Sequence, residues 1–264
     1  MYASRRQQYL DALGVDVWVS RRAPPPVIEE PATRAIEVPP APSPQNADIV
    51  APRTAPAPVV VNISRSPKSR VANCDELWSA LKAEVAQCTK CGLHATRKQG
   101  VFGVGDQQAD WMVIGEAPGA EEDRRGEPFV GAAGQLLNAM LKAIGLARES
   151  VYIANILKSR PPGNRDPQPD EVAACFPYLN RQIALIRPKL ILAVGRIAVQ
   201  NLLGTTAPLG RLRGQVHTFG ELGTPLIATY HPAYLLRSPG EKRKAWEDLK
   251  FARDFFNRQA EQAR

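Results

Sequence analysis

The chain has 264 residues, with 34 Lys and Arg against 26 Asp and Glu, and four Cys. It contains no run of about 18 apolar residues and opens without the apolar stretch of a secretory signal, so we expect no membrane span and a cytoplasmic protein. Four cysteines, two of them spaced Cys-x-x-Cys, argue against a disulfide scaffold and favour metal or redox chemistry. The net charge of +8 favours a polyanionic partner only weakly.

The first 70 residues read as two segments. Residues 1–22 place apolar side chains, among them Trp18, between pairs of arginines, which predicts a short module of its own. Residues 23–70 form a Pro/Ala-rich linker, because residues 21–70 hold 12 of the 24 prolines and no glycine or aromatic residue. Such a stretch buries too little apolar surface to offset its ordering entropy, so we expect a disordered tether. The body, residues 71–264, is long enough for one stable core.

Apolar runs and helical patterns alternate along the body. Each apolar run is nearly continuous, as expected for strands that are buried on both faces of a parallel sheet. The predicted strands are residues 111–114, 151–156, 190–194 and 226–230. The predicted helices are residues 75–87, 132–144, 170–186, 196–203 and 241–257. This rhythm predicts an α/β domain with a central parallel sheet.

Polar residues follow three of these predicted strands. Glu116 comes after the first, Asn155 ends the second, and His231 follows the fourth. Because ligands bind at the carboxyl ends of parallel strands, we expect these side chains to meet at one rim. Asn155 presents both a donor and an acceptor, which is the pattern needed to read the edge of a base. The alternatives are that Glu116 only caps the next segment and that Asn155 and His231 are structural.

Glycines and basic residues suggest where an anion binds. Gly131, Gly134 and Gln135 open a predicted helix, whose free N–H groups and dipole favour an anion; tight helix packing is the alternative. Basic residues fall in loops near the same rim, where they suit a phosphate track unless they only solubilise the surface. They are Lys158, Arg160, Arg165, Arg211, Arg213 and Arg237.

Four motifs in order along the body resemble those of family 4 uracil-DNA glycosylases. They are GEAPGAEED at 115–123, GEPFVG at 126–131, RPPGNR at 160–165 and HPAYLLR at 231–237. The resemblance covers roughly residues 74–257. It implies a three-layer α/β/α fold with a central four-stranded parallel sheet. It also implies a DNA-repair enzyme that hydrolyses the N-glycosidic bond of uracil in DNA after flipping the base out of the stack.

The resemblance also implies roles for individual residues. Phe129 would stack on uracil and Asn155 would pair with its polar edge. His231 would stabilise the charge that develops on the departing base, and Glu116 would position or activate the water. The Ala117 backbone would lie near a uracil carbonyl.

The HPAYLLR motif would contact the DNA itself. Leu235 and Leu236 would wedge into the duplex where the nucleotide has left, and Arg237 would hold the backbone. The fold, without efficient catalysis, would also suit a DNA-binding or replisome adaptor, which we keep as the alternative function.

Family 4 enzymes carry a structural [4Fe-4S] cluster on four cysteines. Cys88 and Cys91 match the first pair, and Cys175 matches the last ligand. The third position is Ser159 in this chain. A serine alkoxide is an unusual ligand beside the thiolates that such clusters prefer.

This departure leaves four interpretations of the metal site. Ser159 ligates the fourth iron, Cys74 takes its place, a three-cysteine cluster persists with a labile iron, or the cluster is lost. A zinc site from the three cysteines and His94 is a further alternative.

Residues 1–22 resemble the amino-terminal segment of the psi subunit of the bacterial replicative clamp loader. The resemblance implies a docking peptide for that assembly, tethered by the linker to the body. The resemblances together imply a bacterial protein that is associated with the nucleoid. We expect a monomer by default.

Overall fold

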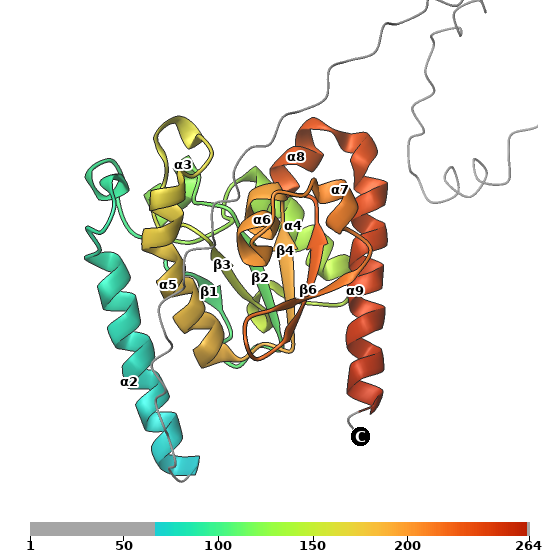
Figure 1. Ribbon diagram of the computed structural model, residues 1–264, viewed down its shortest axis with the longest axis horizontal. Coiled ribbons are helices and arrows are strands. Elements are labelled where there is room, and N and C mark those ends of the chain that lie inside the picture. The colour runs from blue at the N-terminus through green and yellow to red at the C-terminus, as the bar shows by residue number, and fades with distance from the viewer. Residues whose placement is uncertain (1–66, 263–264) are drawn as a thin grey trace, which may run out of the picture. The chain divides into compact units, whose positions relative to one another are not determined.

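The computed structural model describes residues 67–262. The predictions for residues 1–22 and for 23–66 lie outside the described residues. Within them, strands and helices alternate as expected (Figure 1). The strands are β1 (Val104–Gly105), β2 (Trp111–Gly115), β3 (Tyr152–Asn155), β4 (Leu190–Val194), β5 (Val216–Phe219) and β6 (Thr224–Thr229). The α-helices are α2 (Pro67–Ala86), α3 (Ala120–Arg125), α4 (Ala132–Ala143), α5 (Pro169–Ile186), α6 (Arg196–Leu203), α7 (Leu209–Leu212), α8 (Pro232–Arg237) and α9 (Lys242–Gln262).

The sheet has six strands in the order β1-β3-β2-β4-β6-β5. Its four central strands are the predicted ones, and all neighbouring pairs among them are parallel. The prediction of four strands was wrong at the edges, where β1 and β5 add antiparallel pairs. Strand β1 has only two residues, and β5 alternates between exposed and half-buried positions, so neither has the continuous apolar run that marks a buried parallel strand.

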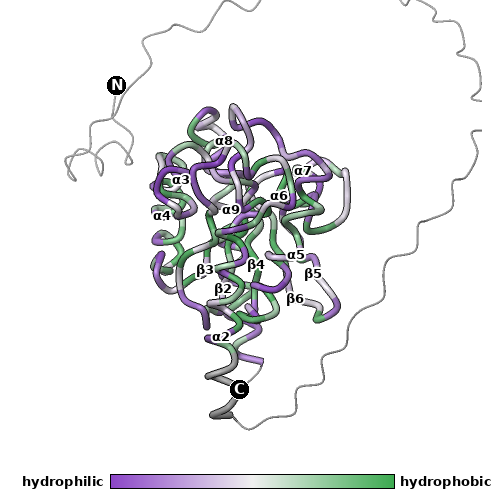
Figure 2. Tube along the Cα trace, turned by 90° about the vertical axis from the view of Figure 1, so that its left-hand side faces the viewer, coloured by the Kyte–Doolittle hydropathy of each residue, from purple (hydrophilic) through white to green (hydrophobic). Residues whose placement is uncertain are grey.

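Helices cover both faces of the sheet, which confirms the α/β fold class and its three layers. One face packs against α2, α5, α6 and α7, through residues such as Leu81 and Leu179. The other packs against α4, α8 and α9, through residues such as Leu141 and Leu249. Figure 2 shows the apolar strands enclosed between these layers. Every residue of β2, β3 and β4 is buried.

The largest boundary difference lies at the start of the body. Helix α2 begins at Pro67, eight residues before the predicted helix start, so the linker predicted to reach residue 70 overlaps it. Among residues 67–262, no helix combines the length and the apolar character that crossing a membrane requires.

Candidate active site

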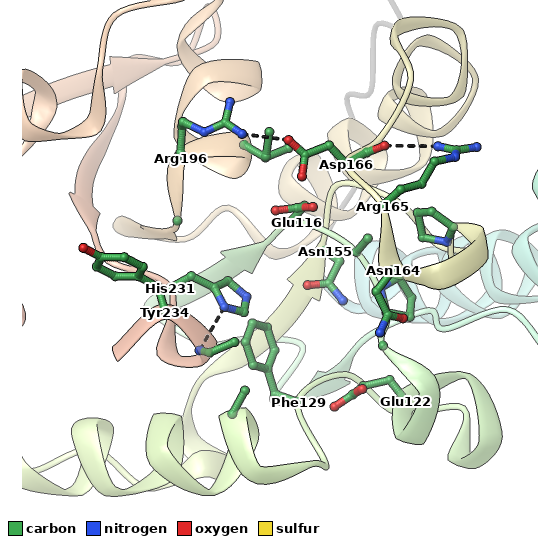
Figure 3. A pocket seen from close by; sticks show the side chains of 18 of the residues that line it. Glu116, Glu122, Phe129, Asn155, Asn164, Arg165, Asp166, Arg196, His231 and Tyr234 are labelled. Atoms are coloured by element: carbon green, nitrogen blue, oxygen red, sulfur yellow. Dashed lines mark hydrogen bonds and ion pairs between the residues drawn. The ribbon is translucent and has the colours of Figure 1, made fainter. Parts of the chain in front are cut away.

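A cavity of about 610 Å³ opens at the carboxyl ends of the parallel strands (Figure 3). Glu116 follows β2, Asn155 ends β3, and His231 comes two residues after β6. Phe129, in the loop between α3 and α4, lines the same cavity, as does Ala117. The five residues predicted to bind or act on a base therefore lie together.

Phe129 and His231 form two neighbouring walls of the cavity. Their ring centroids are 5.6 Å apart and their planes are tilted by 31°. Gly115 makes room beside them, because a Cβ there would lie 2.6 Å from Phe129 Cζ and 2.5 Å from Asn155 Oδ1. The glycine at the end of β2 thus lets an aromatic face and an amide edge stand side by side.

Two charged side chains hold the turn that carries Phe129. The backbone of Phe129 has a φ of +53°, which is strained for an aromatic residue. Arg148 donates to the carbonyl oxygens of Phe129 at 3.1 Å and Pro128 at 2.6 Å. Glu122 Oε1 accepts the next two backbone N–H groups, each at 3.0 Å. Neither Glu122 nor Arg148 was predicted to have a role. Glu122 lies inside the first motif, but Arg148 is about twenty positions from Phe129 and Pro128, and no local pattern marks it.

Asn155 is 2% exposed, and its Oδ1 has no hydrogen-bond partner within the described residues. Its amide lies between Glu116 and Phe129, within the cavity (Figure 3). A buried acceptor left unpaired costs about 1–3 kcal/mol, so native proteins rarely keep one without a reason. This orphaned acceptor needs a donor, and a ligand in the cavity would supply one.

His231 is held as a neutral imidazole. Its Nδ1 accepts the N–H of Ala233 at 3.1 Å at the start of α8, which leaves the ring proton on Nε2. Burial, together with the charge of Arg237, lowers the pKa of His231 to about 4. At neutral pH the ring therefore carries no charge and presents an N–H donor.

Glu116 is one of the carboxyl groups that line the cavity, together with Glu122 and Asp166. Burial and the neighbouring charge of Asp166 raise the pKa of Glu116 to about 7, while Arg196 opposes the shift. Arg196 and Asp166 form an ion pair at 2.7 Å beside it (Figure 3). A carboxyl group with a pKa near neutrality can accept a proton from water. The sequence did not predict the ion pair, because its members are 30 positions apart.

Some of the predicted DNA-binding residues are free to contact DNA. Leu236 is 44% exposed on α8, next to Arg237, which is exposed and lines the cavity. Arg211 and Gln135 are exposed as well. These side chains remain available to a duplex.

Other predicted DNA-binding residues are buried or bonded within the protein, so the prediction was wrong for them. Leu235 is 1% exposed and packs in the core. Arg213 donates to both carboxylate oxygens of Asp248, at 2.7 and 2.9 Å. Lys158, expected in a phosphate track, is 1% exposed.

The two glycines before and within α4 also have internal roles. The N–H of Gly131 already donates to Glu122. A Cβ on Gly134 would lie 1.8 Å from the carbonyl oxygen of Phe129. Tight packing, the alternative to an anion site, therefore describes Gly134.

Three cysteines lie near one another, close to the segment that follows β3. Cys175 is buried, and Cys88 and Cys91 are half-buried. Burial raises the pKa of the Cys175 thiol, and the nearby Cys91 and Cys88 act in the same direction. Among residues 67–262, no group of three or more His, Cys, Asp or Glu side chains is arranged so that it could hold a metal ion. Cys88 and Cys91 lie near Cys175, and cysteine thiolates are the usual ligands of iron–sulfur clusters.

The fourth ligand position does not fit. Ser159 is 3% exposed, and its Oγ accepts a hydrogen bond from Arg97 Nη1 at 2.9 Å. Cys74 is exposed on α2, about 18 Å along the helix axis from Ala86, so it does not reach the other cysteines. The donor set present is three thiols and a hydroxyl that is already engaged.

Comparisons with known proteins agree with this geometry. The model of the uracil DNA glycosylase superfamily matches residues 102–250. The type-4 uracil-DNA glycosylase of Archaeoglobus fulgidus is 47% identical over 173 residues, which cover 63% of this chain and 87% of that protein. The enzyme of the same name from Thermotoga maritima is 40% identical over 189 residues, 70% of this chain and 97% of that protein. A type-5 uracil-DNA glycosylase from Pyrobaculum aerophilum is 33% identical over 149 residues, 50% of this chain and 64% of that protein. The chain belongs to the type-4 uracil-DNA glycosylases of the uracil DNA glycosylase superfamily.

Proposed function

We propose that this chain hydrolyses the N-glycosidic bond of uracil in DNA, with the uracil flipped out of the duplex into the cavity. The observation that carries the proposal is the buried Oδ1 of Asn155, which lacks a donor within the described residues. Uracil offers an N3–H to that oxygen and an O4 acceptor to the amide nitrogen beside it. The bound base would satisfy the acceptor that the protein leaves open.

Phe129 and Ala117 complete the base site. The backbone turn that carries Phe129 is held by Arg148 and Glu122 and the side chain is buried, so a uracil stacking on the ring meets a face that need not be ordered on binding. The backbone of Ala117, half-buried at the cavity wall, is the proposed contact of a uracil carbonyl.

The departing base takes the bonding electrons of the glycosidic bond, so negative charge develops on uracil O2. His231 Nε2–H would donate to that oxygen from a neutral ring, because burial lowers the pKa of the protonated imidazole to about 4. A donor fixed in a buried site stabilises a developing charge without reorganisation.

Glu116 would orient the water that attacks the sugar and accept its proton. The carboxyl group is partly buried, and its raised pKa makes it a stronger base than an exposed glutamate. On the DNA side, Leu236 is the proposed wedge and Arg237 the backbone contact.

The test is release of uracil from a defined oligonucleotide by the full chain under single-turnover conditions. We expect release by the natural chain and a rate lower by roughly 10²–10³-fold for Asn155→Ala. No release by well-folded protein would contradict the proposal and favour the adaptor alternative. The complete pocket argues against that alternative, since an adaptor has no need of an unpaired buried acceptor.

The three cysteines suggest the cofactor. We infer that Cys88, Cys91 and Cys175 hold a structural iron–sulfur cluster by three thiolates, away from the base site. Iron and sulfide analysis of anaerobically purified protein tests this, and protein that folds with neither element would contradict it.

The amino-terminal segment suggests a partner. We propose that residues 1–22 dock on the replicative clamp loader and keep the glycosylase close to newly made DNA in the cytoplasm. A pull-down with the full chain, compared with Trp18→Ala, tests this. Equal capture of both chains, or none, would contradict it.

A further inference from the structure

Lys158 lies three residues after Asn155 and is almost completely enclosed, with 1% of its surface exposed. Its Nζ donates to the carbonyl oxygen of Asn155 at 2.9 Å and to Gln182 Oε1 at 2.6 Å. Both acceptors are neutral. Burying a lysine on neutral partners is unfavourable compared with an apolar side chain, so this position calls for a reason.

The backbone around Asn155 supplies the reason. The N–H of Ile156 donates to Gly115 in β2 at 3.0 Å, so the Asn155 carbonyl, on the same trans peptide, points away from β2. On that side the neighbouring strand is β1, which pairs only with Tyr152 and Ile153. On the β1 side the sheet ladder therefore ends before Asn155, and Lys158 Nζ takes the place of the missing strand donor.

Gln182 fixes the lysine from the opposite side. It is 0% exposed in α5, and its Nε2 donates to the carbonyl oxygen of Phe102 at 2.9 Å and to the Tyr152 hydroxyl at 3.1 Å. The lysine is thus held between a helix and the end of β3, and the peptide after Asn155 is bonded on both sides.

We propose that Lys158 is a positioning residue for base recognition: its Nζ pins the peptide that carries Asn155 and so aims the amide edge at the flipped base. The inference rests on the proposed role of Asn155. A misplacement of about 1 Å in a reacting group can cost on the order of 10²-fold in rate, so a pinned peptide matters to catalysis.

The experiment is a double-mutant cycle in the full chain. Lys158→Met keeps the length of the side chain and removes its donor. We expect single-turnover uracil release to slow by roughly 10–100-fold, while the Kd for uracil-containing DNA changes by less than about 3-fold. In an Asn155→Ala background, the same substitution should cost less than about 3-fold, because the group that it positions is gone.

A general structural role would give a different result. The two losses would then multiply, or the Kd would rise with the rate unchanged, and either outcome would overturn the inference. Tyr152→Phe is the matched control, since it removes a hydroxyl from the same network and leaves both Lys158 bonds intact; its rate should stay within about 2-fold. A full rate for Asn155→Ala alone would instead overturn the proposed role of Asn155, and this inference with it.

A second variant covers the case in which Lys158→Met does not fold. Gln182→Met removes the acceptor that holds Nζ from α5. It should slow uracil release in the natural background and cost less than about 3-fold beside Asn155→Ala. Multiplying losses in this second cycle would overturn the inference just as clearly.

Discussion

The base cavity and the cysteine cluster (Cys88, Cys91 and Cys175) lie at the two ends of the short segment from Asn155 to Ser159. They differ in whether the polar group at that end of the segment has a hydrogen-bond partner. In the cavity, hydrogen bonds hold the Phe129 turn and the His231 ring, while Asn155 Oδ1 has no partner within the part of the chain that the structure describes. Beside the three cysteines, Ser159 occupies the position where the resemblance implies a fourth ligand. Its hydroxyl already accepts a hydrogen bond from Arg97. An open acceptor marks a place that awaits a ligand, whereas a satisfied hydroxyl marks a ligand position that the protein has taken for itself.

The largest expected effect compares one histidine from each region. His231→Ala removes the proposed Nε2–H donor to uracil O2 and should lower the single-turnover rate by roughly 10²–10³-fold. His94→Ala, an exposed residue beside the cysteines, should leave that rate unchanged. Parallel uracil-release assays measure the rates of both variants. Equal losses of rate would show that the cysteine region contributes to catalysis as much as the cavity does.

Gly134→Ala changes the packing of α4 against the turn that carries Phe129, and it makes no change at the cysteine cluster. The new Cβ would lie 1.8 Å from the carbonyl oxygen of Phe129, so α4 and the Phe129 turn must move apart. We expect a loss of about 1–3 kcal/mol in the free energy of unfolding, together with slower uracil release. Gly210→Ala is the control, because a Cβ there meets nothing within 4 Å. Denaturant unfolding that shows the two variants to be equal would contradict the packing role.

A third prediction concerns the pH dependence of uracil release. Glu116 accepts a proton only when ionised, so the rate should rise as the pH passes the pKa of Glu116, about 7. Asp166 raises this pKa and Arg196 lowers it. Asp166→Asn should therefore move the rise to lower pH, and Arg196→Gln to higher pH, each changing the rate at pH 6 by only a few-fold. Shifts in the same direction would show that the ion pair acts only on structure.

The same comparison shows how much the sequence could predict. The central strands and the residues that follow them were predictable, because buried parallel strands are continuous apolar runs and their carboxyl ends share one rim. Strands β1 and β5 were not, since two residues and a half-exposed edge give no such pattern. Among site residues, those inside motifs were found, and those that act from a distance, such as Arg148, were not.

Burial was the hardest property to predict. Lys158 and Arg213 look like phosphate contacts in the sequence, because a basic residue in a loop near a binding rim is normally solvated. Their acceptors, Gln182 and Asp248, are 24 and 35 positions away, so only the fold reveals that both cations face inward. Leu235 and Leu236 differ for a related reason: neighbouring residues on a one-and-a-half-turn helix face different sides, and one of them packs in the core.

Ser159→Cys is expected to have the smallest effect on catalysis. It places a fourth cysteine at the position where the resemblance implies a cluster ligand. A fourth thiolate should raise the iron content of the protein and slow its loss to a chelator in air, because a cluster on three thiolates has one corner without a cysteine ligand. Ser159→Ala is the matched control, since it frees Arg97 without adding sulfur, and it should hold no more iron than the natural chain. Uracil release should stay within about 3-fold in both variants, because the residues that line the base cavity are other than these groups. If the natural chain and Ser159→Cys both fold without iron, the cysteines of this chain do not hold a cluster. A rate that follows the iron content would instead join the two regions into one functional unit, with Lys158, whose backbone N–H donates to Cys175 Sγ at 3.5 Å, as the connection between them.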